Sequence, residues 1–447
     1  MTFAVPNFRS HPGRAITLAA VVWFVVYLVK CWQLSSYAVD MPWSDQWDGE
    51  ISLIYFKAMD GTLGWRDFWA QANEHHIVLT KALALLFFEL HDHGFRQMHV
   101  LAAQTMVLAL IPSILVYALN REQIQPLASG LLVALFLPVF AFENFYWSYQ
   151  SQVYFALLFG VVGTYLMSHE RPSVRCLTLV TLVAGLSNGS SFFIPLLAAL
   201  AVGFWGPRDR RTALKVLYFL ALAMLSFKVF TAPTPGHDVY KATSLIQLWE
   251  SAGRYSAWPG HWGWLFWPLL AGLGGFILYK SLRHGAQHAA SPPDRQARFG
   301  LMLALWFGMF LASSIYARAG FPSVPSRYYD YYLIGFAGLV FLFSRLQGRL
   351  WLPALVLCMV VSLSMASLRS FKEWGQYAQN LNAYRHNMIA ALKLVEKSPD
   401  ISLKEVEAHL KKLPLPYAGY PNYDFPARII LDPRTRIIFR HWGPWAD

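Results

Sequence analysis

Long apolar runs separated by short polar loops dominate this 447-residue chain and restrict it to folds that a lipid bilayer can surround. A helix that crosses the roughly 30 Å hydrocarbon core needs about 20 predominantly apolar residues. Backbone groups within lipid must be satisfied internally, so such runs are expected to be helices and to number about eleven. These runs, several of them short, lie near residues 15–34, 98–119, 127–142, 152–168, 174–190, 191–205, 213–230, 262–281, 299–316, 331–344 and 350–368. The expected fold class is an all-α polytopic membrane protein.

Composition supports a membrane protein and argues against a nucleic-acid-binding one. The chain is 56% hydrophobic and 14% charged, with a mean hydropathy of +0.35, which is too apolar for a soluble protein of this length. Its net charge of +12 comes from short basic clusters between apolar runs, not from one basic stripe. That pattern is typical of loops that stay on the cytoplasmic side. Membrane lipids are therefore expected partners, and nucleic acid is not.

The cysteines and the N-terminus narrow the interpretation further. The three cysteines, Cys31, Cys176 and Cys358, have no C-x-x-C spacing, so neither a disulfide framework nor a thiolate metal site is indicated. Arg9 and Arg14 precede the first apolar run, which ends without a small-residue cleavage site. This start predicts a retained transmembrane helix and not a cleaved signal peptide.

The run Ile77–Leu90 decides the orientation of everything that follows it. At about 14 residues it is too short for a typical span. If it does not cross, the short basic loops all lie inside, as the positive-inside rule requires. They contain Arg9, Arg14, Arg121, Arg171, Arg175, Arg208, Arg210, Arg211, Lys215, Lys280, Arg283, Arg295, Arg298, Arg345 and Arg349. The run is thus predicted to be a juxtamembrane helix on the outer surface of a bacterial inner membrane, with a cytoplasmic N-terminus and a periplasmic C-terminus.

Two domains follow from this topology. A transmembrane domain is expected over 1–368, with 35–97 as its first periplasmic loop, and a small periplasmic α+β domain over 369–447. The tail contains helix signals at Phe371–Lys397 and at Ser402–Leu413, the second opened by a Ser-x-x-Glu capping box. The sequence RIILDPRTRIIF predicts a hairpin of two strands around Asp432-Pro433.

Ionisable residues concentrate in the first outer loop. Asp45 and Asp48 follow the first run in WSDQWDGE, and Glu74 and His75 precede the juxtamembrane run in NEHH. Carboxylates gathered at a membrane surface suggest function. One would act as general base toward an acceptor hydroxyl, while Glu74 with a histidine would hold a divalent ion (Mg²⁺, Mn²⁺ or Zn²⁺) or orient the substrate. The structural alternative is that the two aspartates cap a helix running to about Met59.

Two further groups of polar residues lie on later outer loops. Arg318 and Arg327 in RAGFPSVPSRYYD oppose the charge bias and are suited to bidentate phosphate contact, although snorkelling to lipid headgroups is the alternative. Lys81 is a weaker phosphate candidate for the same reason. Glu143 and Gln150, in ENFYWSYQSQ, are placed to hydrogen-bond sugar hydroxyls.

This layout resembles the GT-C superfamily of integral-membrane glycosyltransferases, which includes the protein O-mannosyltransferases and the lipid A aminoarabinose transferase. The resemblance depends on an acidic motif after the first span, two juxtamembrane helices, and an acidic residue between the third and fourth spans. It covers roughly the first 170 residues, the late Arg-Tyr position and the outer tail. The residues that carry it are Asp45-Gln46-Trp47-Asp48, Gly61, Asn73-Glu74-His75-His76, Lys81, Glu143 and Arg327-Tyr328.

The resemblance implies an inverting glycosyltransferase that moves a sugar from a polyprenyl-phosphate carrier to a glycan, lipid or protein acceptor such as pilin, on the periplasmic face. Asp45 or Asp48 would be the catalytic base, Glu74 would assist through a metal or a hydrogen bond, and a late arginine would hold the carrier phosphate. Lys81 and His76 would also bind the carrier phosphate, and the late arginine is Arg327, which Tyr328 follows and assists. The usual acidic pair is adjacent or one residue apart, whereas these aspartates are three apart. An O-antigen polymerase or ligase, or a lipid-linked-sugar flippase, is the alternative; a flippase would show charges within its spans.

Overall fold

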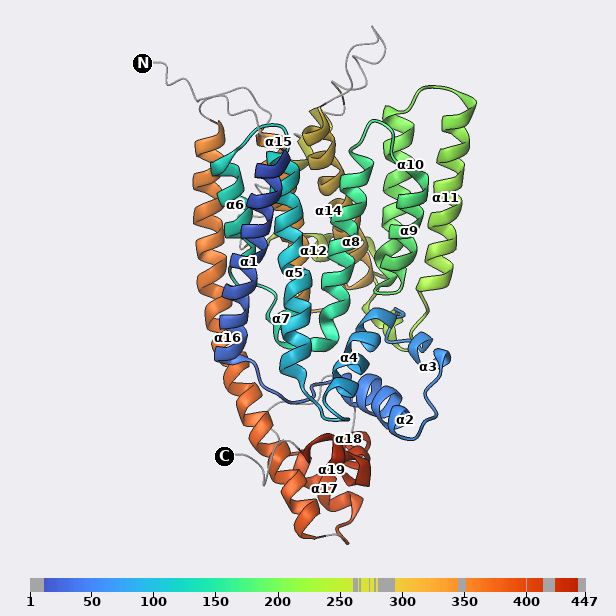
Figure 1. Cartoon of the computed structure of the whole chain (residues 1–447), viewed down its shortest axis with the longest axis vertical. Coiled ribbons are helices and arrows are strands. Elements are labelled where there is room, and N and C mark those ends of the chain that lie inside the picture. Colours follow the sequence, from blue (N-terminus) through green and yellow to red (C-terminus); the bar gives the residue numbers. More distant parts are fainter. Residues whose placement is uncertain are drawn as a thin grey trace.

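The computed structural model describes residues 12–259, 264, 267–272, 274–276, 279, 294–344, 351–398, 400–412 and 423–440. Every regular element in these ranges is a helix, and the β-type pairing there is confined to isolated bridges from His75 to Ala72 and to Thr231. Long helices form a bundle with shorter helices gathered at one end (Figure 1). The all-α prediction is confirmed for this part of the chain.

The bundle coincides with the predicted apolar runs. Ten of the eleven runs are helices, and the remaining one, 262–281, is described only in part, with its described residues 264, 267–272, 274–276 and 279 helical. Helix α1 packs on α5, α10 on α11, and α14 on α15. The bundle helices are α1 (Pro12–Tyr37), α5 (Gln97–Asn120), α6 (Pro126–Phe136), α8 (Ser151–Met167), α9 (Val174–Gly185), α10 (Phe193–Trp205), α11 (Arg210–Phe230), α14 (Arg295–Ala317), α15 (Tyr329–Phe343) and the first part of α16 (Trp351–Lys397).

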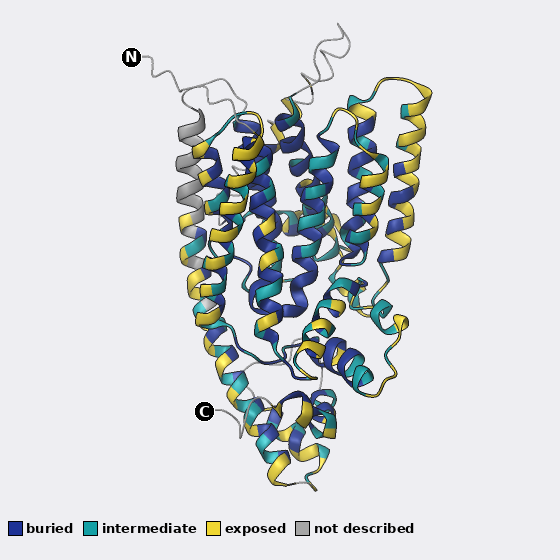
Figure 2. Ribbon diagram, in the orientation of Figure 1, coloured by how far each residue is buried: buried dark blue, intermediate teal, exposed yellow. Residues whose placement is uncertain are grey.

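The outer surface of the bundle is apolar. Helices α1, α5, α11 and α14 are each long and apolar enough to cross a membrane. On α1, Phe24 and Trp32 are 55% and 66% exposed, and on α11, Leu217 and Met224 are 61% and 72% exposed (Figure 2). Soluble monomers rarely leave such a continuous apolar surface uncovered. The arrangement is therefore compatible with a multi-pass membrane protein.

The segment between α1 and α5 returns to the end of the bundle from which it departs. The predicted juxtamembrane helix is α4 (Val78–Leu90), and it lies at this end together with η1 (Trp47–Tyr55), α2 (Phe56–Met59) and α3 (Trp65–Trp69) (Figure 1). Gln97, at the start of α5, donates hydrogen bonds to the carbonyls of Val39 (2.9 Å) and Met41 (3.1 Å), just after α1. Thus α1 and α5 are antiparallel neighbours, and α4 does not pass through the bundle.

Further short helices lie in the segments between the long helices. They connect the long helices and carry several of the predicted site residues. They are α7 (Phe142–Tyr146), η2 (Ser148–Gln150), η3 (Gly189–Phe192), η4 (His237–Tyr240), α12 (Leu245–Ser256) and η6 (Ser326–Tyr328). Helix α12 is amphipathic, with Leu245, Ile246 and Trp249 each more than 70% exposed. Such a helix is suited to lie in the interface of a membrane.

The tail is helical where it was expected to contain a hairpin. Helix α16 continues without a break from the last apolar run through residue 397, and α17 (Leu403–Leu410) begins with the predicted capping box of Ser402 and Glu405. The predicted strand pair is wrong, because α18 (Asp424–Leu431) and α19 (Pro433–Ile438) occupy those residues. The Asp432 carboxylate caps α19 by accepting from the Arg434 amide (2.9 Å). Proline fits the first helical position that follows such a cap, so Asp-Pro starts a helix here and not a turn.

Close packing between α8 and α14 generates a testable expectation. A Cβ on Gly160 would lie 2.0 Å from the ring of Trp306, which is 3% exposed. Gly160→Ala should lower the free energy of unfolding by about 1–3 kcal/mol, because a buried indole must shift. Gly308→Ala is the matched control, since no atom of the described residues lies within 4 Å of the place its methyl group would take, and it should be neutral or slightly stabilising. Thermal unfolding in detergent measures both, and equal melting temperatures for the two variants would contradict this packing.

Candidate functional site

Buried amides fix the loop that follows α1. The Gln46 side-chain amide donates to Glu50 Oε2 and to the Ser148 hydroxyl, both at 2.9 Å. Ser148 in turn donates to Gln97 Oε1 at 3.2 Å. All four side chains are buried. Because buried polar groups that are paired in a network hold one geometry, this network sets where the acidic motif lies relative to α5 and η2.

Asp45 is held by two residues with unusual backbone conformation. Its Oδ1 accepts from the Ser44 hydroxyl (3.0 Å) and its Oδ2 from the Asn73 amide (3.2 Å), and the residue is half-buried. Ser44 and Asn73 have φ values of +46° and +51°. Left-handed backbone is costly for residues other than glycine and clusters at functional sites. The first loop therefore presents the Asp45 carboxylate in a constrained position.

Asp48 lies in a different environment from Asp45. It is exposed in the first turn of η1, and its Oδ1 accepts from the Gly49 amide at 2.9 Å. The residue just before η1, in the N-cap position, is Gln46, which makes no side-chain capping bond. Asp45 therefore does not cap this helix, whereas Asp48 is suited to its positive end.

Glu74 joins the first loop to the end of α14. Its Oε1 accepts from Arg318 Nη2 and from His237 Nδ1, each at 2.6 Å. Burial works against ionisation, but the hydrogen bond from His237 and the charge of Arg318 lower the pKa of Glu74 to about 2. Arg318 Nε donates to the Tyr328 hydroxyl at 3.3 Å. Glu74 is thus an ionised carboxylate committed to an arginine.

The predicted metal ligands do not fit a metal ion in this arrangement. A cation at Glu74 would lie beside the Arg318 guanidinium and be repelled by it. His75 Nδ1 is 3.3 Å from the Gly189 amide, which donates to it, and burial lowers the pKa of His75 to about 4. Within the described ranges, no group of three His, Cys, Asp or Glu side chains is placed to hold a metal.

The Glu143 side chain positions Arg327 by accepting a hydrogen bond from the Arg327 backbone amide. Glu143 Oε2 accepts from the Ser326 hydroxyl (2.8 Å) and from the Arg327 amide (3.0 Å). The Arg327 guanidinium is 3.9 Å from Glu143 Oε1 and keeps 31% of its side chain exposed. This guanidinium is loosely paired and so is able to accept an anion.

Asn144 and the buried residues Asp330 and Lys30 lie behind the Arg327 backbone and support it. The Asn144 amide donates to the Arg327 carbonyl (2.8 Å) and to Asp330 Oδ2 (2.9 Å). Asp330 and Lys30 are buried and line one small cavity, and Lys30 Nζ donates to the Pro138 carbonyl at 2.8 Å. The predicted site residues did not include this pair, although a lysine inside the first apolar run is the signal that would have revealed it.

Three residues that were predicted to bind the substrate or its phosphate instead contact other residues of the protein. The buried Lys81 ammonium donates to the carbonyls of Asp67 (3.1 Å), Phe68 (3.4 Å) and Ala70 (2.7 Å), which uses its three protons. The His76 ring stacks on Trp69 with centroids 4.6 Å apart. Gln150 is buried, and its Oε1 accepts weakly from Gln152 at 3.5 Å. In this structure their polar atoms hold the loops together.

Three side-chain hydrogen bonds, joined by two peptide bonds, lead from the first loop to the late arginine. We call this set of contacts the Glu74 network. Asn73 contacts Asp45, its neighbour Glu74 pairs with Arg318, and Arg318 contacts the Tyr328 hydroxyl. The network comprises Asp45, Asn73, Glu74, Arg318, Tyr328 and Arg327, of which Asn73 alone was not among the predicted site residues. It brings a constrained carboxylate and an available guanidinium to the same end of the bundle.

The buried Glu50 makes stability dependent on pH. Burial, opposed by hydrogen bonds from Gln46 and Tyr55, raises the pKa of Glu50 to about 7 from its ordinary value of 4.5. Between these values the folded chain keeps a proton that the unfolded chain releases, so the free energy of unfolding falls as pH rises from about 4.5 to 7. Glu50→Gln should remove this dependence and gain on the order of 3 kcal/mol relative to the parent at about pH 8.

Thermal unfolding at about pH 5 and pH 8 tests the role of Glu50. The exposed Glu122→Gln variant is the control and should follow the parent at both values. A Glu50→Gln variant with the same pH profile as the parent would show that Glu50 is ionised in the folded state.

Comparisons of this chain with protein-family models, with curated proteins and with solved structures find no match.

Proposed function

We propose that this chain is an inverting glycosyltransferase of the GT-C type, which transfers a sugar from a polyprenyl-phosphate carrier to an acceptor on the periplasmic face of a bacterial inner membrane. The observation that supports the proposal most directly is the Glu74 network. It links a constrained carboxylate, Asp45, with a loosely paired guanidinium, Arg327, through three side-chain hydrogen bonds joined by the Asn73–Glu74 and Arg327–Tyr328 peptide bonds. Sugar transfer from a phosphate carrier needs both a base and an anion-binding group.

The carrier phosphate is assigned to Arg327, assisted by Tyr328. Glu143 holds the Arg327 amide, so the position of this residue does not depend on its guanidinium. A guanidinium on a backbone held in place, with its charge available, stabilises the charge that develops on a departing phosphate. Arg318 already pairs with Glu74 at 2.6 Å, and it adds positive potential while orienting Tyr328.

The base is assigned to Asp45. The acceptor oxygen attacks the anomeric carbon, its proton passes to the Asp45 carboxylate, and the bond between that carbon and the phosphate oxygen breaks. The electron pair of the broken bond stays with the carrier phosphate beside Arg327. Attack from the face opposite the leaving group inverts the anomeric configuration. Glu74 acts by orienting Arg318, and this scheme assigns no step to a metal ion.

The apolar exterior supports a lipid-borne donor. A polyprenyl chain is soluble in the bilayer, and the exposed faces of α1 and α11 are suited to contact lipid. The amphipathic α12 would lie at the membrane surface near the site, since Ala242, just before it, donates to the Tyr316 carbonyl (2.9 Å) at the end of α14. The donor would then reach Arg327 laterally from the outer leaflet.

A transporter or flippase is the second candidate, and the Lys30–Asp330 pair is the observation that favours it. Ionisable residues within spans commonly mark transport pathways, and these two are buried. However, Asp330 lies in the first turn of α15, and Lys30 lies seven residues before the end of α1. Both are near the end that carries the candidate site, where Asp330 supports Arg327 through Asn144. This location favours a positioning role.

Replacement of the two aspartates tests the assignment of the base. Asp45→Asn should reduce sugar transfer by about 10²–10⁴-fold, because the amide cannot accept the proton. Asp48→Asn is the matched control in the same motif and should retain activity within about tenfold. Mass spectrometry of surface glycans and pilins from a deletion strain, complemented with each variant, provides the readout. Both variants should express and unfold like the parent, and full transfer by Asp45→Asn would refute the assignment.

A further inference from the structure

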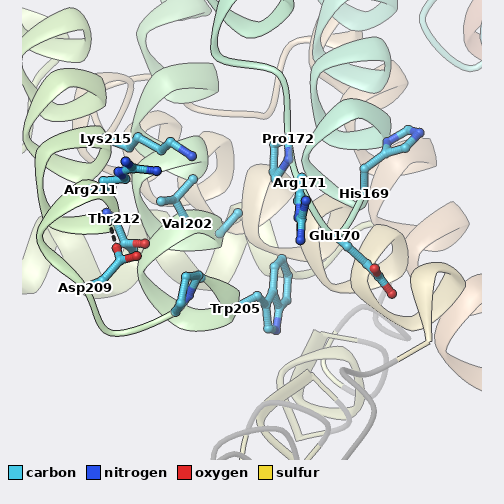
Figure 3. Close-up of a pocket in the computed structure, with 13 residues that line it drawn as sticks. His169, Glu170, Arg171, Pro172, Val202, Trp205, Asp209, Arg211, Thr212 and Lys215 are labelled. Atoms are coloured by element: carbon cyan, nitrogen blue, oxygen red, sulfur yellow. Dashed lines mark hydrogen bonds between the residues drawn. The ribbon is translucent and has the colours of Figure 1, made fainter. Parts of the chain in front are cut away.

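A cavity of about 150 Å³ lies at the end of the bundle opposite the Glu74 network. It is enclosed by the loop after α8, the end of α10 and the start of α11 (Figure 3). Arg211 and Lys215 project from the α11 side, and Arg171 faces them across the space (Figure 3). The cavity therefore has cationic side chains on two walls.

Two carboxylates, Glu170 and Asp209, also line this cavity, and Asp209 attracts Arg211 and Lys215 without forming an ion pair with them. Within the described part of the chain, none of Arg171, Arg211 and Lys215 forms an ion pair. The nearby Asp209 carboxylate is used as the cap of α11, where it accepts from the Thr212 amide at 2.7 Å. Three charges with donor hydrogens facing one space are suited to bind a phosphate group.

One buried donor lies unused at the cavity wall. Trp205 lines the cavity, and its buried Nε1 has no hydrogen-bond acceptor among the described residues. A buried donor without an acceptor costs about 1–3 kcal/mol, so a ligand that brings an acceptor is favoured here.

Apolar side chains continue outward from the cavity along the bundle. Phe204 on α10 is 37% exposed, and Leu214 and Leu217 on α11 are 56% and 61% exposed. A ligand that combined a phosphate with acyl chains would satisfy both the cationic walls and this apolar surface. Basic pockets between spans on the cytoplasmic side bind acidic lipid headgroups for this reason.

We propose that this cavity binds the headgroup phosphate of an anionic membrane phospholipid, with its acyl chains along α10 and α11. On the topology proposed above, the lipid belongs to the cytoplasmic leaflet. The binding is independent of the sugar-transfer reaction, because the cavity and the Glu74 network lie at opposite ends of the bundle.

Native mass spectrometry of the full chain, released from detergent in the presence of phosphatidylglycerol or phosphatidylcholine, tests this site. The parent should retain phosphatidylglycerol in preference to phosphatidylcholine. The triple variant Arg171→Ala, Arg211→Ala, Lys215→Ala should bind phosphatidylglycerol about tenfold or more weakly. Trp205→Phe keeps the charge but removes the donor, and it should weaken binding several-fold.

The matched control is the triple variant Arg175→Ala, Arg208→Ala, Arg210→Ala, which removes the same charge from exposed residues that do not line the cavity. It should retain phosphatidylglycerol like the parent. An equal loss in this control would show that general surface charge attracts the lipid and would overturn the site. Displacement of the lipid by soluble glycerol 3-phosphate at similar concentration would also overturn it, in favour of a free phosphate ligand.

Discussion

Two hydrogen bonds from Gln97 to the carbonyls of Val39 and Met41 fasten the start of α5 to the end of α1, and the rest of the site depends on this closure. Because the chain leaves and re-enters the bundle at the same end, α4 lies beside the bundle and not across it (Figure 1). A crossing α4 would instead separate Asp45 from Arg327. In that alternative the carbonyls of Val39 and Met41 would each lose the hydrogen bond from Gln97, which disfavours it.

The site itself is organised by carboxylates that hold arginines in different ways. Glu74 pairs directly with the Arg318 guanidinium, whereas Glu143 accepts from the Arg327 backbone amide. The first arrangement neutralises an arginine, and the second fixes an arginine while leaving its charge available. The proposed anion-binding role of Arg327 follows from this difference.

Much of the fold could be predicted from the sequence, because hydrophobic length and the distribution of basic residues act over whole segments. Ten apolar runs are helices, α4 does not cross the bundle, and Ser402 begins α17. The prediction of a strand hairpin failed because Asp432-Pro433 suits both a turn and the start of a helix, and here the two residues start α19, with Ile430 and Ile438 buried in the tail.

The candidate site could be predicted only in part, because the spacing of residues along the sequence does not show which side chains pair in the fold. The acidic motif and the late arginines were found from their charge, but the Glu74–Arg318 pair joins residues 244 positions apart. Lys81 was predicted to bind a phosphate, but its ammonium donates to three carbonyls at the end of α3. His237 carries no signal of its own and gains a role only from its partner Glu74, while Asn73, part of the predicted NEHH motif, was assigned no role until its contact with Asp45.

The measurement that tests the central claim most directly is the side of the membrane on which the Glu74 network lies. Alkaline phosphatase and green fluorescent protein, each fused after the last residue of the full chain, report the side of the tail, which contacts the first loop through Arg434 and Asp60. A periplasmic network predicts active phosphatase and no fluorescence. Fluorescent fusions with inactive phosphatase would place the tail, and the network with it, in the cytoplasm and would contradict the proposed site.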